Sequence, residues 1–137
     1  MNRENALTQE NALTGDNAPA GNNVLTIENL QSYFFTARGT VPAVDDVTIE
    51  VPAGKIIGLV GESGCGKSMT AMSVMGLLRH PGKVVGGRIT LDGRDITYLN
   101  PKERARVRGN EISMIFQEPM TSLNPVYPVG RQVQEAI

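Results

Sequence analysis

One glycine-rich run, Gly61–Ser68, constrains this chain more than any other feature of its sequence. It reads GESGCGKS and matches the pattern GxxxxGK[ST] at every fixed position. The β-branched apolar run Ile56–Val60 lies just before it and predicts a buried central strand. After it, residues 68–79 are predicted to form a helix, because apolar residues recur at the spacing of one helix face, at Ala71, Val74, Met75 and Leu78. Strand, loop and helix in this order are the context in which the pattern binds phosphate.

Each residue type in this run has a separate part in holding a phosphate chain. Glycines at 61, 64 and 66 permit the torsions and the close approach that let successive N–H groups converge on an anion. The helix that follows adds unpaired N–H groups and the positive end of its dipole. Lys67 is predicted to reach the β and γ phosphates, and the Ser68 hydroxyl to ligate Mg²⁺. The predicted ligand is therefore ATP with Mg²⁺, held by Gly61, Glu62, Ser63, Gly64, Cys65, Gly66, Lys67, Ser68 and Met69.

The side chain of Cys65 leaves two interpretations open. In the first, only its backbone N–H matters for phosphate binding. In the second, the helix N-terminus and Lys67 favour a thiolate, whose alkylation bound nucleotide would slow. Since Cys65 is the single cysteine, no internal disulfide can form, and a reducing compartment such as the cytoplasm is expected.

The bulk composition is that of one globular domain. Hydrophobic residues make up 40% of the 137 positions, and the net charge of -1 provides no field that would attract nucleic acid. Residues 1–23 contain a short Glu-Asn-Ala-Leu-Thr repeat and few apolar residues, so a disordered tail is predicted there. Residues 24–137 are expected to form the domain, and no stretch of about 18 apolar residues predicts a membrane span.

Local patterns predict the remaining elements. Apolar residues in 24–35 and 44–51 indicate two antiparallel strands. A further strand is expected over Arg88–Leu91 and another over Ile112–Phe116. Asn100, followed by proline at the first helical position and glutamate at the third, is typical of a helix start.

The downstream segment 112–125 reads ISMIFQEPMTSLNP and resembles the Q-loop region of ABC ATPases. By that resemblance Gln117 ligates Mg²⁺, helps position the attacking water, and links the nucleotide site to membrane subunits. The combination of GESGCGKS with MIFQEPMTSLNP looks specifically like the importer branch for oligopeptides, dipeptides, glutathione and nickel. The resemblance extends from about Val24 to Ile137.

The resemblance implies a fold and a set of partners. The fold would be α/β, a P-loop NTPase core with an ABC-type antiparallel β subdomain. Lys67 and Gln117 would take part in ATP hydrolysis that energises peptide import, with a second ATPase subunit and membrane-spanning permease subunits as partners. The location would be peripheral, at the cytoplasmic face of the bacterial inner membrane.

An aromatic residue near the end of the first strand stacks on adenine in this family. Tyr33, Phe34 and Phe35 compete for that role here, and the family's spacing favours Phe34. Any of the three rings could instead be part of the core.

The family's signature sequence, its Walker B strand with the catalytic Glu, and its switch His follow the Q-loop, and none occurs before Ile137. The chain is therefore expected to be the N-terminal portion of the domain, without complete hydrolytic machinery. His80 precedes the Q-loop and is expected to be solvated, and Asp45 and Asp46 are expected to form a turn. A nucleotide-binding regulator without ATPase activity is one alternative; an ABC ATPase acting on DNA or ribosomes is another.

Two clusters have simple structural interpretations. Methionines in the predicted helix after the loop are expected to fill core space, namely Met69, Met72 and Met75. Basic residues alternate along a short downstream helix and are expected to form a solvated face with no nucleic-acid role, namely Lys102, Arg104, Arg106 and Arg108.

Overall fold

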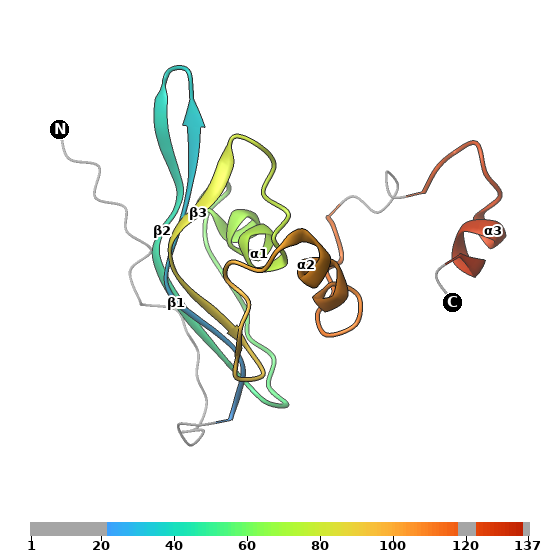
Figure 1. Cartoon of the computed structure of the whole chain (residues 1–137), viewed down its shortest axis with the longest axis horizontal. Coiled ribbons are helices and arrows are strands. Elements are labelled where there is room, and N and C mark those ends of the chain that lie inside the picture. The colour runs from blue at the N-terminus through green and yellow to red at the C-terminus, as the bar shows by residue number, and fades with distance from the viewer. Residues whose placement is uncertain (1–21, 118–122, 136–137) are drawn as a thin grey trace.

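The computed structural model describes residues 22–117 and 123–135. Most of the predicted N-terminal tail and part of the Q-loop segment lie outside these ranges. The elements in chain order are β1 (Asn23–Thr36), β2 (Gly39–Pro52), α1 (Lys67–Met75), β3 (Gly82–Leu91), β4 (Arg94–Asp95), α2 (Pro101–Val107) and α3 (Val129–Gln134). Figure 1 shows β1 and β2 as a long hairpin beside β3, with α1 against them.

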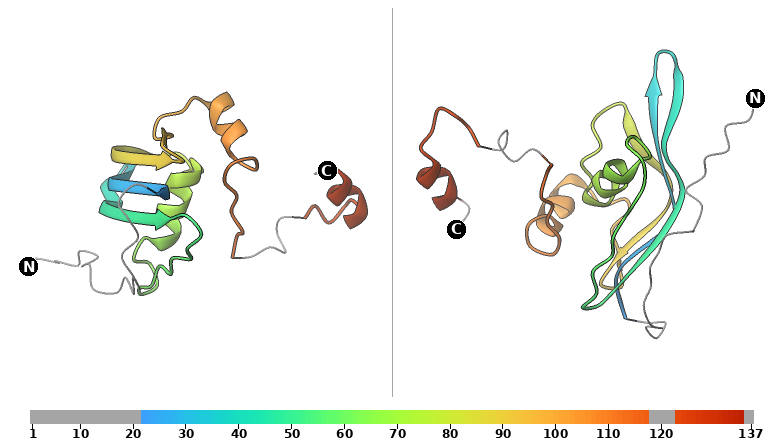
Figure 2. Two further views of the ribbon diagram at one scale, coloured as in Figure 1. Left: turned by 90° about the horizontal axis from the view of Figure 1, so that it is seen from below. Right: turned by 180° about the vertical axis from the view of Figure 1, so that it is seen from behind.

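The strands form one antiparallel sheet with the order β2-β1-β3-β4. The two predicted antiparallel strands are confirmed, and the second begins earlier than predicted, at Gly39. β1 lies at the centre and pairs with both long neighbours, so that Ile27 has Ile49 on one side and Ile89 on the other. Figure 2 shows α1 and α2 on the same face of the sheet.

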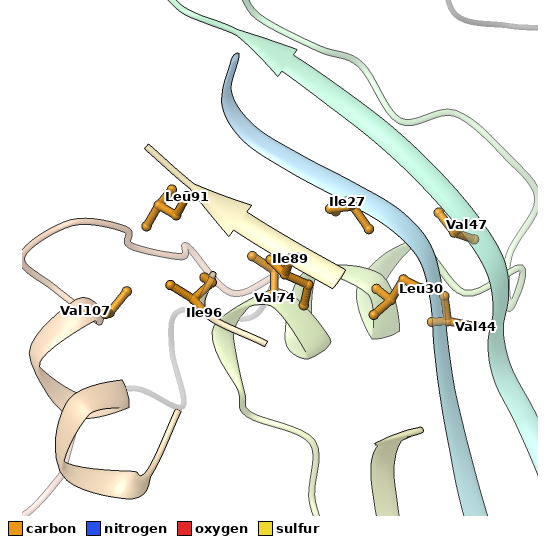
Figure 3. Packing of buried hydrophobic residues seen from close by; sticks show 9 residues of the cluster. All are labelled: Ile27, Leu30, Val44, Val47, Val74, Ile89, Leu91, Ile96 and Val107. Carbon is orange, nitrogen blue, oxygen red and sulfur yellow. The ribbon is translucent and has the colours of Figure 1, made fainter. Parts of the chain in front are cut away.

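The hydrophobic core lies between this sheet face and the two helices (Figure 3). Every second residue of β3 contributes near its end, which is the period at which strand side chains share a face. The helices close the core from the other side through one valine each. The buried residues of this hydrophobic core are Ile27, Leu30, Val44, Val47, Val74, Ile89, Leu91, Ile96 and Val107.

Helix α1 is shorter than the predicted range 68–79, because Gly76 ends it. Gly76 has a φ of 62° and its N–H bonds to the carbonyl groups of Met72 and Ser73. A residue in this left-handed conformation satisfies the last carbonyl groups of a helix and turns the chain away. Leu78 therefore lies outside the helix.

The predicted start of α2 is confirmed in detail. The Asn100 side chain accepts hydrogen bonds from the N–H groups of Lys102 and Glu103, both at 3.0 Å. The Glu103 carboxylate in turn accepts from the Asn100 N–H at 3.1 Å. This reciprocal capping box satisfies donors that the first turn would otherwise leave unpaired.

Two predicted strands are wrong. Residues 56–60 form no strand, and the side chains of Ile56 and Val60 are 98% and 73% exposed. Residues 112–116 are also irregular, apart from an isolated bridge between Arg108 and Ile112. A buried parallel strand needs partners on both sides, and the described sheet provides none for either run. An apolar pattern alone therefore did not make these segments strands.

The core predicts a large difference between two isoleucine substitutions. Ile89→Ala removes a fully buried side chain and is expected to lower the free energy of unfolding by about 2 to 5 kcal/mol. Ile56→Ala, the matched control, should change it by less than about 0.5 kcal/mol. Urea unfolding of the two variants measures both values, and equal losses would contradict this placement of the core.

Candidate phosphate-binding site

The glycine-rich loop leads directly into the N-terminus of α1. Gly64 and Gly66 have φ values of 82° and 96°, and Gly66 is the residue that caps the helix. The first N–H groups of a helix have no acceptor within it, and in α1 no described side chain caps them. These groups and the helix dipole favour an anion at this end.

Gly66 also fixes the loop against the sheet. A Cβ atom at this position would lie 2.6 Å from the carbonyl oxygen of Ala43 in β2. Only glycine combines this φ with so close an approach to backbone. The glycine-rich pattern explains Gly66 by phosphate binding, whereas the contact with Ala43 depends on the tertiary fold and has no local sequence signal.

The ammonium group of Lys67 is held inside its own loop. Its Nζ donates to the carbonyl oxygens of Gly61 at 2.6 Å and Glu62 at 2.7 Å. It also lies 3.3 Å from the Sγ atom of Cys65. A full positive charge is thereby placed among the backbone groups of the loop, where a bound phosphate chain would compete with these carbonyl oxygens for its protons.

The Cys65 side chain is half-buried and packs over Gly61. A Cβ atom added to Gly61 would come within 2.7 Å of the sulfur. The thiol therefore occupies space within the loop, next to the ammonium group of Lys67. Both interpretations of Cys65 remain open in this geometry.

The three aromatic residues at the end of β1 have different surroundings. The Tyr33 hydroxyl donates to Asp45 at 2.6 Å, and this hydrogen bond raises the pKa of Tyr33, as do desolvation and the charges of Asp45 and Asp46. Phe35 is exposed, and Lys83 lies 5.9 Å from its ring centre.

Phe34 is half-buried and packs closely on Gly82. It pairs with Val41 of β2, two residues before Ala43, the residue that Gly66 contacts.

The two predicted magnesium ligands both lie on the surface. Ser68 is exposed in the first turn of α1. Gln117 is also exposed, and among the described residues no hydrogen bond joins it to the glycine-rich loop. Residues 118–122 of the predicted Q-loop segment lie outside the description. Within the described ranges, no three His, Cys, Asp or Glu side chains gather as a metal site.

The remaining predictions are confirmed in part. Met75 is buried and Met69 packs against the core, as expected, and His80 is exposed. Asp45 and Asp46 do not form the predicted turn, because both lie inside β2. A local irregularity in this strand gives Asp46 a φ of 54°.

The predicted solvated basic face is wrong at one position. Lys102 and Arg106 are exposed, but Arg104 is only 8% exposed. Its guanidinium group donates to the carbonyl oxygens of Val74 and Thr97. These two acceptors, of which Val74 lies at the end of α1, explain why this cation is buried.

A glycine-rich loop with left-handed torsions, a helix N-terminus without a side-chain cap and a lysine held among the loop carbonyl groups are the features of a P-loop nucleotide-binding protein. The curated relatives support this class. Over 115 residues, the chain is 47% identical to the oligopeptide transport ATP-binding protein AppD of Bacillus subtilis, covering 83% of this chain and 35% of the relative. It is 46% identical over 114 residues to OppD of Escherichia coli, another oligopeptide transport ATP-binding protein, with coverages of 83% and 34%.

The chain belongs to the ABC transporter family, whose model matches residues 44–136. It spans about a third of the length of these curated relatives, 34 to 35%.

Solved structures show the same fold. A nucleotide-free ATP-binding cassette from an ABC transporter is 25% identical, with a TM-score of 0.53, and the match covers 82% of this chain and 46% of that one. The bacterial ABC transporter cassette MJ0796, solved as a dimer, has a TM-score of 0.65 at 18% identity, with the same coverages of 82% and 46%. The ABC cassette fold is therefore shown, and the described residues supply its antiparallel sheet. Each helix described here falls short of the length and apolar character that crossing a bilayer requires.

The contact at Gly66 predicts that two glycines of the loop differ in their tolerance of alanine. Gly66→Ala combines a left-handed φ with the collision against Ala43, and we expect it to lower the free energy of unfolding by about 3 kcal/mol. Gly64→Ala meets open space, so that only the backbone strain of about 1 to 2 kcal/mol remains. Thermal unfolding of both variants tests this order, which equal losses would contradict.

Proposed function

We propose that this chain binds ATP with Mg²⁺ at its glycine-rich loop, as the nucleotide-binding part of an ATPase that energises peptide import. The observation that carries this proposal is the position of Lys67 Nζ, which lies 2.6 and 2.7 Å from two carbonyl oxygens of the loop at the N-terminus of α1. Membership in the ABC transporter family supports it, as does the similarity to the oligopeptide transport ATP-binding protein AppD. We also propose that the chain forms part of the α/β P-loop core that its family resemblance implies.

In this proposal, different groups of the site bind different parts of the nucleotide and its Mg²⁺ ion. Converging N–H groups at the start of α1 hold phosphate oxygens, and Lys67 exchanges its carbonyl partners for the β and γ phosphates. Ser68 and Gln117 are the proposed Mg²⁺ ligands, and oxygen donors of this kind suit that ion. Bound Mg²⁺ supplies positive charge that offsets the negative charge of the phosphates.

Phe34 is the proposed partner of the adenine ring. The Tyr33 hydroxyl is already bonded to Asp45, and Lys83 lies near the face of Phe35. Phe34 lies between them in sequence, on the hairpin that also contacts the loop through Ala43. Stacking on a base would contribute about 0.5 to 1.5 kcal/mol beyond burial.

The assembly and the location complete the proposal. AppD and OppD are described as oligopeptide transport ATP-binding proteins, and the MJ0796 cassette was solved as a dimer. By analogy, we place this chain with a second ATPase subunit and membrane-spanning permease subunits, at the cytoplasmic face of the bacterial inner membrane. The proposed cargo class is peptides. Nucleotide binding is assigned to the described residues, and hydrolysis, in which Lys67 and Gln117 would take part, to the complete cassette.

Calorimetric titration of the chain with ATP and Mg²⁺ tests the central step. We expect the unmodified chain to bind with a Kd below about 1 mM, equivalent to at least roughly 4 kcal/mol. Lys67→Ala should weaken binding by about tenfold or more, because a charge-assisted contact is lost. Lys102→Ala, which removes an exposed lysine on α2, is the matched control. Equal affinity of the chain and the Lys67 variant would contradict the proposed site.

Cys65 provides a chemical test of the same site. Because its sulfur lies 3.3 Å from Lys67 Nζ, bound ATP should cover the thiol and slow its alkylation by iodoacetamide several-fold. Mass spectrometry follows the modification, and adenosine, which has no phosphate, serves as the control ligand. An unchanged alkylation rate at saturating ATP would place the nucleotide elsewhere.

A further inference from the structure

Helix α1 is held at three points along its length. Gly66 at its N-terminus contacts Ala43 of β2. In its middle, the hydroxyl groups of Ser73 and Ser32 lie 2.8 Å apart, and both residues are fully buried. The third point is the C-terminus, where Arg104 of α2 is in contact.

The Arg104 guanidinium group packs directly on the end of α1. Its Nη1 donates to the Val74 carbonyl oxygen at 3.1 Å, and its Nη2 donates to the Thr97 carbonyl oxygen at 2.9 Å. A Cβ atom at Gly76 would lie 2.7 Å from its Nε. One planar group thus joins the C-terminus of α1 to the segment that precedes α2.

The burial of this charge needs an explanation. Among the described residues no carboxylate forms an ion pair with Arg104. Desolvation lowers its pKa, with a further contribution from Arg108, yet a guanidinium group stays protonated at neutral pH. A buried cation is unfavourable unless it is well hydrogen-bonded. Here two carbonyl groups provide the compensation, that of Val74 at the negative end of the α1 dipole and that of Thr97 before α2.

Helix α2 also connects to the segment that ends at Gln117. The N–H groups of Glu111 and Ile112 both bond to the Val107 carbonyl oxygen, at 2.9 and 3.1 Å. A bridge between Arg108 and Ile112 adds to this connection. Helix α2 therefore contacts the C-terminus of α1 through Arg104 and, through Val107 and Arg108, the start of the segment that leads to Gln117.

We propose that Arg104 is a positioning residue for the phosphate site. By fixing the C-terminus of α1 relative to α2, it sets where the N–H groups at the other end of this short helix converge. This inference rests on the proposed nucleotide binding at the loop. Arg104 touches no nucleotide atom in this scheme and acts through α1.

Four variants of the full chain separate positioning from general stability. Arg104→Gln removes the charge and the planar, forked guanidinium group. Arg104→Lys keeps the charge but places all its N–H donors on a single nitrogen. Val107→Ala leaves a cavity on the same helix and retains the contacts of Arg104, so it serves as the destabilised control. Arg106→Gln changes an exposed neighbour and serves as the charge control.

The first measurement is the Kd for ATP with Mg²⁺, with the thermal midpoint recorded for each variant. Arg104→Gln should weaken binding by about tenfold, within the range of energetic coupling between linked sites. Arg104→Lys should recover part of that loss. Val107→Ala should lower the midpoint without weakening binding at temperatures where it is folded, and Arg106→Gln should change neither. If Val107→Ala weakens binding as much as Arg104→Gln, the positioning role is wrong.

The second measurement needs no nucleotide. The Thr70 N–H bonds to the Gly66 carbonyl oxygen at 2.8 Å, so hydrogen exchange at this amide reports the first turn of α1. Arg104→Gln should accelerate exchange at Thr70 more than Val107→Ala does, and equal rates would overturn the inference. If the unmodified chain fails to bind ATP, the proposed function fails by itself, and the exchange rates still decide the role of Arg104.

Discussion

The contact of Gly66 with the Ala43 carbonyl oxygen determines where the phosphate loop lies relative to the sheet. At a φ of 96° and with space for no Cβ atom, the chain can pass this point only as glycine. The helix that follows has nine residues, fewer than the roughly 12 to 15 that an isolated helix needs to be stable in water. Its position therefore depends on tertiary contacts with β2, β1 and α2. Each of these contacts contributes to the geometry of the loop.

The sequence was sufficient to predict those features that depend on interactions between residues close together in the chain. The glycine-rich loop, the antiparallel pair formed by β1 and β2, and the capping box at Asn100 all depend on residues near one another in the chain. The run 56–60 was not predictable in the same way. Its composition suits a buried parallel strand, but a strand is defined by hydrogen bonds to partners, and the described sheet is antiparallel throughout.

The buried arginine shows a second limit of local reasoning. Basic residues alternate around α2, and the sequence alone assigned all of them to solvent. Arg104 is buried because the Val74 carbonyl group at the end of α1, 30 residues away in the chain, accepts a hydrogen bond from it, as does the Thr97 carbonyl group. The contact of Gly66 with Ala43 has the same origin. The proposed role of Ser68 comes from the glycine-rich pattern itself, whereas those of Gln117 and Phe34 come from the family resemblance.

The central claim is that the loop and α1 recognise a phosphate chain, and comparison of ATP with AMP tests it most directly. Calorimetric titration of the chain with each nucleotide in the presence of Mg²⁺ gives the two affinities. The account predicts that ATP binds at least about tenfold more tightly, a difference of roughly 1.4 kcal/mol, because Lys67 reaches the β and γ phosphates. Equal affinity for AMP and ATP would show that the phosphate chain is not what the loop holds, and would contradict the account.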